Sequence, residues 1–288
     1  MTDLELQQYR ARLWRTDGNP VRTLEDARRF LESVGLCLMY PERSMPLVPT
    51  LIGAFVGSAE NLPDQKHAFA DPRAREATEL MVRLLRDRAA HEAHFYTGNN
   101  LILDASLFPF LYALLSDRNP KAPPRPKTQG AEISPLAITV FEALQKSGPM
   151  SKGQLRSTLG GELSSAGLDR ALGELWAILK ITRVDYRDDV GAFWDVLYRW
   201  APEAVKEGIN VSAPEAVSAL VSKYLEAVVA ASEQEIEEFF LRLTSRAKVR
   251  EAVNALLAAR ELSLIGVGSR ALIHVTPVAE EQQSRSHG

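Results

Sequence analysis

The sequence predicts a mostly helical α+β protein whose second half contains two copies of one unit, each made of three short helices and a β-hairpin. Three observations support this fold class. The apolar pattern of the second half repeats at an offset of 81 residues. Each copy changes from helical to strand spacing at the corresponding point. Hydrophobic residues make up 45% of the 288 residues and charged residues 25%, as in an ordinary globular protein.

The two copies agree in their helix starts as well as in their apolar faces. Side chains four residues apart lie on one face of a helix. The first helices place apolar residues in this way at Leu136, Val140 and Leu144 and, in the second copy, at Val217, Val221 and Leu225. Capping boxes begin at Ser151 and Ser232, and third helices begin at Ser164 and Ser245. Since these separate signals share one offset, we interpret them as a duplication and expect Leu172 and Val253 to be buried at equivalent positions.

Each third helix is followed by a hairpin pattern. The strands and turns are predicted at 181–184, 188–191 and 193–198 in the first copy and at 262–265, 266–269 and 271–275 in the second. Three short helices followed by a hairpin is the order of a winged helix, whose third helix can enter the major groove of DNA. The sequence therefore predicts tandem winged-helix domains at 131–211 and 212–278, followed by a flexible tail at 279–288.

Residues 1–116 are predicted to form a divergent third winged-helix-like α/β domain. The expected elements are helices at 24–34, 48–56 and 71–89, a strand at 36–39, a hairpin at 93–96 and 101–103, and a docking helix at 106–115. This order fits a winged helix with a helical extension. No match at the 81-residue offset supports it, and a mixed α/β domain of another kind fits equally well.

Residues 117–130 are predicted to be a basic linker that the prolines keep extended. The basic side chains are Arg118, Lys121, Arg125 and Lys127, and Asp117 is the one acid. These side chains could contact DNA phosphates, or the stretch could be a solvated spacer.

The two copies differ at the start of the third helix, where a helix-turn-helix contacts DNA. The second copy carries Arg246, Lys248 and Arg250 there. The first copy carries Ser165, Gly167 and Asp169, of which the aspartate would repel phosphate. Arg270, near the second hairpin turn, could add a contact from the wing. We therefore predict that the second copy binds DNA, although ordinary surface charge balanced by Glu251 explains the same residues.

Several classes of protein are excluded or disfavoured by composition. The longest apolar runs, such as 227–231, fall far short of the roughly 20 residues of a membrane span. Acids at positions 3 and 5 do not fit a signal peptide, and Cys37, the single cysteine, allows no internal disulfide. Neither the histidines nor the glycines have the spacing of a metal site or a dinucleotide loop. We expect a cytoplasmic protein with no membrane contact, no metal and no cofactor.

Two short segments, 34–41 (Val-Gly-Leu-Cys-Leu-Met-Tyr-Pro) and 108–113 (Phe-Pro-Phe-Leu-Tyr-Ala), together with the three predicted units, resemble the AlkZ-related proteins. These are relatives of the YcaQ/AlkZ winged-helix DNA glycosylases that repair interstrand crosslinks. In the glycosylases a Gln-x-Gln or similar pair in the N-terminal part positions the hydrolytic water. Here Gln7 and Gln8 are adjacent, and Gln282 and Gln283 lie in the tail. The resemblance therefore implies DNA binding more strongly than base excision.

The sequence leaves three functions open. The first is binding to duplex DNA, with repair as a candidate role. The second is a DNA glycosylase that holds a flipped nucleotide between the units, with Glu92, Asp104 or Glu132 orienting water. The third is a scaffold for protein partners, which the net charge of −3 favours. Salt-dependent duplex binding would separate the first two from the third, and release of free base would identify the second.

Overall fold

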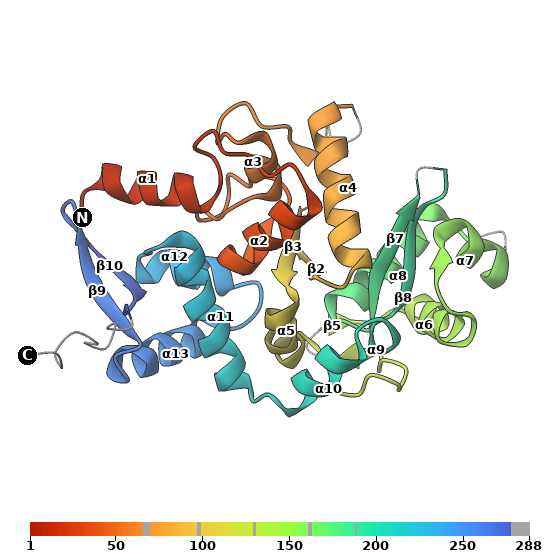
Figure 1. Ribbon diagram of the computed structural model, residues 1–288. Coiled ribbons are helices and arrows are strands. Elements are labelled where there is room, and N and C mark those ends of the chain that lie inside the picture. The colour runs from red at the N-terminus through yellow and green to blue at the C-terminus, as the bar shows by residue number, and fades with distance from the viewer. Residues whose placement is uncertain (66–69, 97–98, 129–130, 161–162, 188, 278–288) are drawn as a thin grey trace, which may run out of the picture.

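The computed structural model describes residues 1–65, 70–96, 99–128, 131–160, 163–187 and 189–277. Over these residues the protein is a mostly helical α+β fold with small antiparallel sheets. Figure 1 shows the N-terminal part at the top and centre, the first repeated segment at the right and the second at the lower left. In the described part of the chain no helix is long and apolar enough to cross a membrane. The tail expected at 279–288 lies outside the described residues.

The N-terminal part is built on a three-stranded sheet in the order β1-β3-β2. The strands are β1 (Leu36–Leu38), β2 (Ala90–Tyr96) and β3 (Asn99–Asp104). One sheet face packs against α2 (Leu24–Val34), α3 (Leu51–Val56) and α4 (Pro72–Arg86). The other face packs against α5 (Phe108–Leu115), which follows the short helix η2 (Ala105–Leu107), and against α11 (Ala213–Val228) of the second segment. The sheet therefore lies between two apolar cores.

Most elements expected in this part are confirmed, with shifted ends. The helix at 24–34 begins at a capping box of Thr23 and Asp26 and ends at Gly35, whose φ of 71° is available to glycine at little cost. The second helix begins later than expected, because the hydroxyl of Thr50 accepts a hydrogen bond from Gly53 and caps a helix that starts at Leu51. The turn of the expected hairpin includes 97–98, which lie outside the described residues.

The two repeated segments have the same element order. The first contains α6 (Pro135–Ser147), β6 (Met150–Ser151), α7 (Lys152–Leu159), α8 (Ser165–Ala177), β7 (Ile181–Arg187) and β8 (Gly191–Val196). The second contains α11, α12 (Glu233–Phe240), α13 (Arg246–Ala258), β9 (Leu262–Val267) and β10 (Arg270–Val275). Helices α12 and α13 have the bounds of α7 and α8 shifted by 81 residues, and an isolated bridge at Ala231 stands where β6 would be. The expected burial of Leu172 and Val253 is confirmed, since each is 1% exposed.

The N-terminal part shares this order too. Elements α2, β1, α3, α4, β2 and β3 follow one another as α6, β6, α7, α8, β7 and β8 do. The strand order β1-β3-β2 also corresponds to the order β6-β8-β7 of the first segment. Similar topology therefore occurs three times along the chain, although only the second and third occurrences are related by a constant offset.

Two expected boundaries in the first segment differ from the structure. The strand expected at 193–198 ends at Val196, and α9 (Leu197–Trp200) follows it. The carboxylate of Asp195 accepts a hydrogen bond from the Val196 amide and pairs with Arg199 four residues on, which is helical spacing. Helix α10 (Pro202–Asn210) follows and packs on α5. This helix was not predicted from the sequence.

Helix α1 (Asp3–Leu13) was also missed, because Leu6 is its one buried residue and its sequence has no apolar stripe. Polar side chains hold this region to the second segment instead. The Arg10 guanidinium donates to the carbonyl oxygens of Val228 and Ala230, at 2.8 and 2.7 Å. The Trp14 indole donates to the carbonyl of Ala227 at 2.7 Å. These bonds satisfy carbonyl groups at the end of α11 and just beyond it, where the helix supplies no amide partner.

The basic stretch after α5 is attached to the first segment by Lys180. Its side chain is 2% exposed, and its ammonium donates to the carbonyl oxygens of Asn119 and Ala122 and pairs with Asp117 at 2.9 Å. Burial lowers the pKa of Lys180, and Asp117 acts in the opposite direction. The stretch ends in β4 (Lys127–Thr128), which pairs with β5 (Ala131–Glu132).

Candidate functional site

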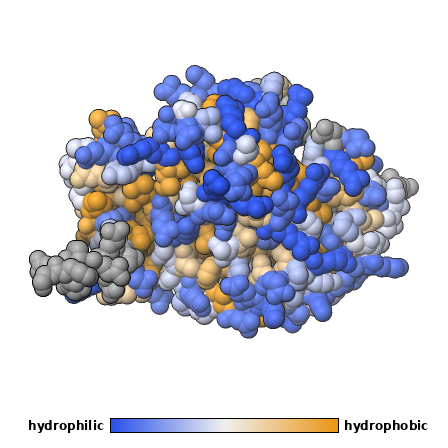
Figure 2. All heavy atoms as spheres, in the orientation of Figure 1, coloured by the Kyte–Doolittle hydropathy of each residue, from blue (hydrophilic) through white to orange (hydrophobic). Residues whose placement is uncertain are grey.

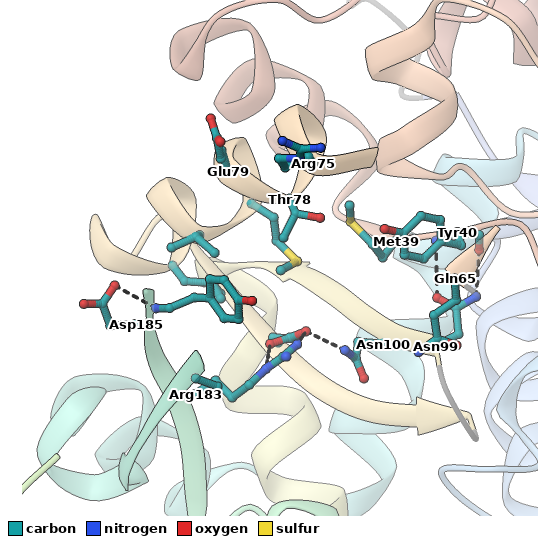
Figure 3. A pocket seen from close by; sticks show the side chains of 16 residues that line it. Met39, Tyr40, Gln65, Arg75, Thr78, Glu79, Asn99, Asn100, Arg183 and Asp185 are labelled. Atoms are coloured by element: carbon teal, nitrogen blue, oxygen red, sulfur yellow. Dashed lines mark hydrogen bonds and ion pairs between the residues drawn. The ribbon is translucent and has the colours of Figure 1, made fainter. Parts of the chain in front are cut away.

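A cavity of about 460 Å³ lies where the N-terminal part meets the hairpin β7–β8 (Figure 3). Helix α4, the chain after β1 and the strands β2 and β3 form most of its lining, and β7 and β8 close the remaining side. This volume lies within the range of roughly 300–1,000 Å³ of small-molecule sites. The face seen in Figure 2 is mostly hydrophilic, with apolar side chains gathered near β9 and β10.

The floor of the cavity is a charged network centred on Glu92, whose side chain is fully buried. The Arg183 guanidinium donates through Nε to Glu92 Oε2 at 2.8 Å and through a second nitrogen to Oε1. The Asn100 amide donates to the same Oε1 at 2.6 Å. Burying a carboxylate is costly unless a partner neutralises it, and Arg183 supplies that partner from a strand 91 residues away.

Trp176 at the end of α8 fixes the other side of this network. Its indole donates to the backbone carbonyl of Glu92 at 3.3 Å, and the Arg183 guanidinium lies over its ring, 5.1 Å from the centroid. Trp176 in turn meets Trp194 edge to face at 5.2 Å. Both the third helix and the hairpin of the first segment are thus joined to β2.

Asn99 fixes the cavity wall at Tyr40, because its side-chain amide pairs with both backbone groups of that residue. Its side-chain amide donates to the Tyr40 carbonyl at 2.7 Å and its oxygen accepts from the Tyr40 amide at 3.3 Å. The Tyr40 hydroxyl interacts with Thr78 of α4, and burial raises the pKa of Tyr40. Figure 3 shows Tyr40 and Asn99 together on the side of the cavity opposite Asp185.

Exposed residues mark the mouth of the cavity. Gln65, Arg75 and Glu79 line it and are exposed. On the hairpin side, Asp185 pairs with Arg86 of α4 at 2.5 Å. Arg75 forms no ion pair with any residue that the structure describes, so its guanidinium is available to an anion at the mouth.

Two histidines lie on β2 beside Glu92, and burial lowers the pKa of both. His91 points to the opposite sheet face, where it stacks on Phe108 with 4.1 Å between centroids, and its pKa falls to about 4. His94 shares the face of Glu92 and lies 5.6 Å from the Trp176 ring. Within the described ranges no three potential metal ligands come together.

The three acids that the sequence offers for orienting water lie in different parts of the structure. Glu92 lines the cavity, whereas Asp104 caps η2 by accepting from the Ser106 amide, and Glu132 is exposed in β5. Arg183 and Asn100 were not predicted from the sequence as site residues. An arginine in a hairpin strand gives no local sign that its partner is a carboxylate in another part of the chain.

Of the cations expected on the second segment, Arg246, Lys248 and Arg250 lie at the start of α13 and Arg270 begins β10. None of them lines the cavity. Arg250 binds Glu237 through two nitrogens, and Arg246 approaches Glu237 at 3.9 Å. Arg270 pairs with Asp3 of α1 at 2.5 Å. Lys248 is exposed and forms no ion pair in the described part of the chain.

The four linker cations do not line the cavity either. The Arg118 guanidinium donates to the backbone carbonyls of Ala113 and Ile209, which ties it to the ends of α5 and α10. Lys121, Arg125 and Lys127 are exposed, and Lys121 borders a separate groove described below.

Comparison with known proteins gives one family and one fold. The sequence model of the family described as DNA glycosylase AlkZ-like matches residues 70–285. Among solved structures, the chain is similar to the Streptomyces sahachiroi DNA glycosylase AlkZ, with a TM-score of 0.61 and 17% identity over 96% of this chain and 70% of that one. No curated protein matches the sequence significantly.

Proposed function

The chain belongs to the AlkZ-like DNA glycosylase family, and we propose that it binds duplex DNA and excises an altered base that it holds in the cavity between β2–β3 and β7–β8. The observation that carries this proposal is the buried Glu92–Arg183–Asn100 floor of a cavity large enough for a nucleotide. A base inside a duplex is out of reach, so a glycosylase must extrude it into such a pocket.

Excision is a hydrolysis at C1′ of the deoxyribose. The bond between C1′ and the base nitrogen breaks, and its electron pair leaves with the base. An N-alkylated purine, which is cationic while attached, departs as a neutral base. A water oxygen bonds to C1′, and the proton it loses passes to a carboxylate and then to solvent. The products are a free base and an abasic site.

We assign the carboxylate role to Glu92. Arg183 fixes its orientation, and Oε2 accepts one hydrogen bond from the described residues, which leaves room for a water. Positioned acid–base groups contribute roughly 10²- to 10⁴-fold to such reactions. Tyr40 and Tyr186, which line the walls, offer flat surfaces for a base, and Arg75 at the mouth offers a contact for the flanking phosphate.

The test uses a duplex with a single N-alkylated purine, and it measures abasic sites by strand cleavage in alkali under single-turnover conditions. We expect the wild type to release base and Glu92→Gln to release it at least about 100-fold more slowly. The matched control is Glu174→Gln, because the Glu174 side chain is also largely buried and pairs with an arginine, Arg170, on α8, away from the proposed DNA-binding surface. Equal loss in both variants would assign Glu92 a structural role, and duplex binding without any release by the wild type would favour a non-catalytic DNA-binding protein.

We also propose that the three related segments are winged helices and that the second repeated segment contacts the duplex. The common element order of the three segments supports the first proposal. Helix α8 packs on β2 through Trp176, so its role is structural, and this favours α13 as the helix that contacts the duplex. Arg246 and Lys248 at the start of α13 would bind phosphates or base edges. Arg250 would release Glu237, and Arg270 would release Asp3, to bind phosphate as well.

Duplex affinity of paired variants at one salt concentration tests this assignment. We expect Arg246→Ala/Lys248→Ala to weaken binding and Arg170→Ala/Arg187→Ala, which removes two exposed cations of the first segment, to change it little. The reverse result would place the DNA-binding surface on the first segment.

A further inference from the structure

A second concave surface lies between the basic stretch after α5 and the helices α9 and α10, at the bottom of the molecule in Figure 1. It is an open groove of about 600 Å³. One side is formed by Pro120 and Lys121, and the other by one face of α10 with Val205 and Lys206. Tyr198 of α9 also lines the groove.

The side of the groove that bears Lys121 is held in place by the first segment. The Gln145 amide donates to the backbone carbonyl of Lys121 at 2.8 Å and to the Tyr198 hydroxyl at 3.3 Å. Lys180 binds the carbonyls of Asn119 and Ala122, one on each side of Lys121 along the chain. The groove is therefore preformed, and the basic stretch presents Lys121 at a fixed place.

The charge of the groove has one sign. Its charged residues are Lys121, Arg199 and Lys206, and among the described residues no aspartate or glutamate lines it. Arg199 is already neutralised by Asp195 at 2.6 Å. Lys121 and Lys206 are exposed and form no ion pair within the ranges that the structure describes.

Apart from Asn210, the rest of the lining is apolar or aromatic. Besides Tyr198 it includes Pro120, Pro202, Val205 and Ile209. Grooves that combine an aromatic platform with flanking cations hold unpaired nucleotides, because the bases pack on the apolar surface while the phosphates meet the cations. An intact duplex presents phosphates but keeps its base faces stacked inside, so it would leave the apolar part of this groove uncovered.

We propose that this groove binds a single-stranded segment of DNA, with phosphates at Lys121 and Lys206 and a base on Tyr198. This inference rests on the proposed action on DNA, because extruding one base leaves the nucleotide opposite it without a pairing partner. Lys121, one of the four cations in the stretch after α5, would then have a role in binding.

The experiment measures anisotropy of a labelled 12-nucleotide oligo(dT) titrated with the full chain at several salt concentrations. Each phosphate contact on a single strand contributes about 0.7 to the slope of log affinity against log salt. We expect Lys121→Gln/Lys206→Gln to lower the slope by about 1.4, the sum of two contacts. The matched control is Arg43→Gln/Arg260→Gln, which removes two exposed cations from distant loops and should leave most of the slope intact.

A second pair of variants tests the aromatic platform. Tyr198→Phe should retain affinity for the oligonucleotide, whereas Tyr198→Ala should lower it roughly fivefold to a hundredfold, the range for loss of one stacked base. Thermal unfolding of both variants identifies any loss caused by misfolding, and equal affinity of Tyr198→Ala and Tyr198→Phe would overturn the role of the ring.

An unchanged slope in Lys121→Gln/Lys206→Gln would overturn the proposal. So would a result in which those substitutions abolish binding of a labelled peptide of alternating Glu and Leu but not of oligo(dT), since the groove would then take an acidic protein segment. Base release from the alkylated duplex is a separate measurement. Groove-dependent oligonucleotide binding without base release would overturn the proposed excision and leave this inference standing.

Discussion

The ion pair at the cavity floor makes a prediction about stability that is independent of any reaction. Replacing Arg183 with Met keeps an apolar stem over the Trp176 ring but leaves the fully buried Glu92 carboxylate without its cation. Breaking a buried pair by removing one partner costs about 3–5 kcal/mol. Because the Arg183 side chain is 26% exposed, we expect the lower end of that range, about 3 kcal/mol.

The double variant Arg183→Met/Glu92→Gln tests the cause of the loss. A neutral glutamine has no charge to leave unpaired, and its oxygen still accepts from Asn100. We expect the double variant to recover at least about 1 kcal/mol of the free energy of unfolding lost by the single variant. Urea unfolding followed by tryptophan fluorescence measures both. A double variant that is less stable than Arg183→Met would refute the view that Arg183 compensates the charge of Glu92.

Two further predictions concern other buried groups. Leu172→Ala and Val253→Ala should both destabilise the protein, the leucine by about 2–5 kcal/mol, and a loss for Leu172→Ala below 1 kcal/mol in urea unfolding would contradict its place in a packed core. Since the pKa of His91 falls from 6.5 unfolded to about 4 folded, the unfolded chain binds this proton first as pH falls. Wild-type stability should therefore decrease between pH 6.5 and 4, His91→Gln should flatten that decrease, and identical pH profiles would show that His91 does not cause it.

The helices and hairpins of the repeated segments could be predicted because their signals are local. The hydroxyls of Ser151 and Ser232 cap α7 and α12 as the capping boxes indicate. Helix α1 could not be predicted in this way, whereas α10 was missed although Pro202 at its first position is a local signal for a helix start. The first is held by Arg10 and Trp14 binding distant carbonyls, and its own apolar pattern is almost absent.

The candidate site could be predicted only in part for the same reason. Glu92 was one of three acids with nothing in the sequence to choose between them, and its importance depends on Arg183, which the fold brings from another segment. The cations of α13 were visible as a cluster, but their pairing with Glu237 depends on the packing of α12 against α13. Local pattern identifies elements, whereas these charges acquire their partners from contacts between elements.

That distinction can be tested with two glycines that the sequence does not distinguish. Gly208 lies in α10 where it packs on α5, and a Cβ there would sit 2.6 Å from the Pro109 carbonyl oxygen and 2.9 Å from a Tyr112 ring carbon. Gly173 lies inside α8, and a Cβ there would meet nothing within 4 Å beyond its chain neighbours and the backbone of its own helix. Gly208→Ala should therefore destabilise the protein by about 1–3 kcal/mol through overpacking. Gly173→Ala should stabilise it by roughly 0.5–1 kcal/mol, because alanine loses less backbone freedom in a helix than glycine does.

Urea unfolding of the two variants beside the wild type measures both effects with the same substitution. If Gly208→Ala proves as stable as Gly173→Ala, the close approach of α10 to α5 is wrong. The groove between α10 and Lys121 would then also lose its fixed geometry, since α5 holds α10 in place. The packing of one glycine thus checks the geometry of the groove that we propose for single-stranded DNA.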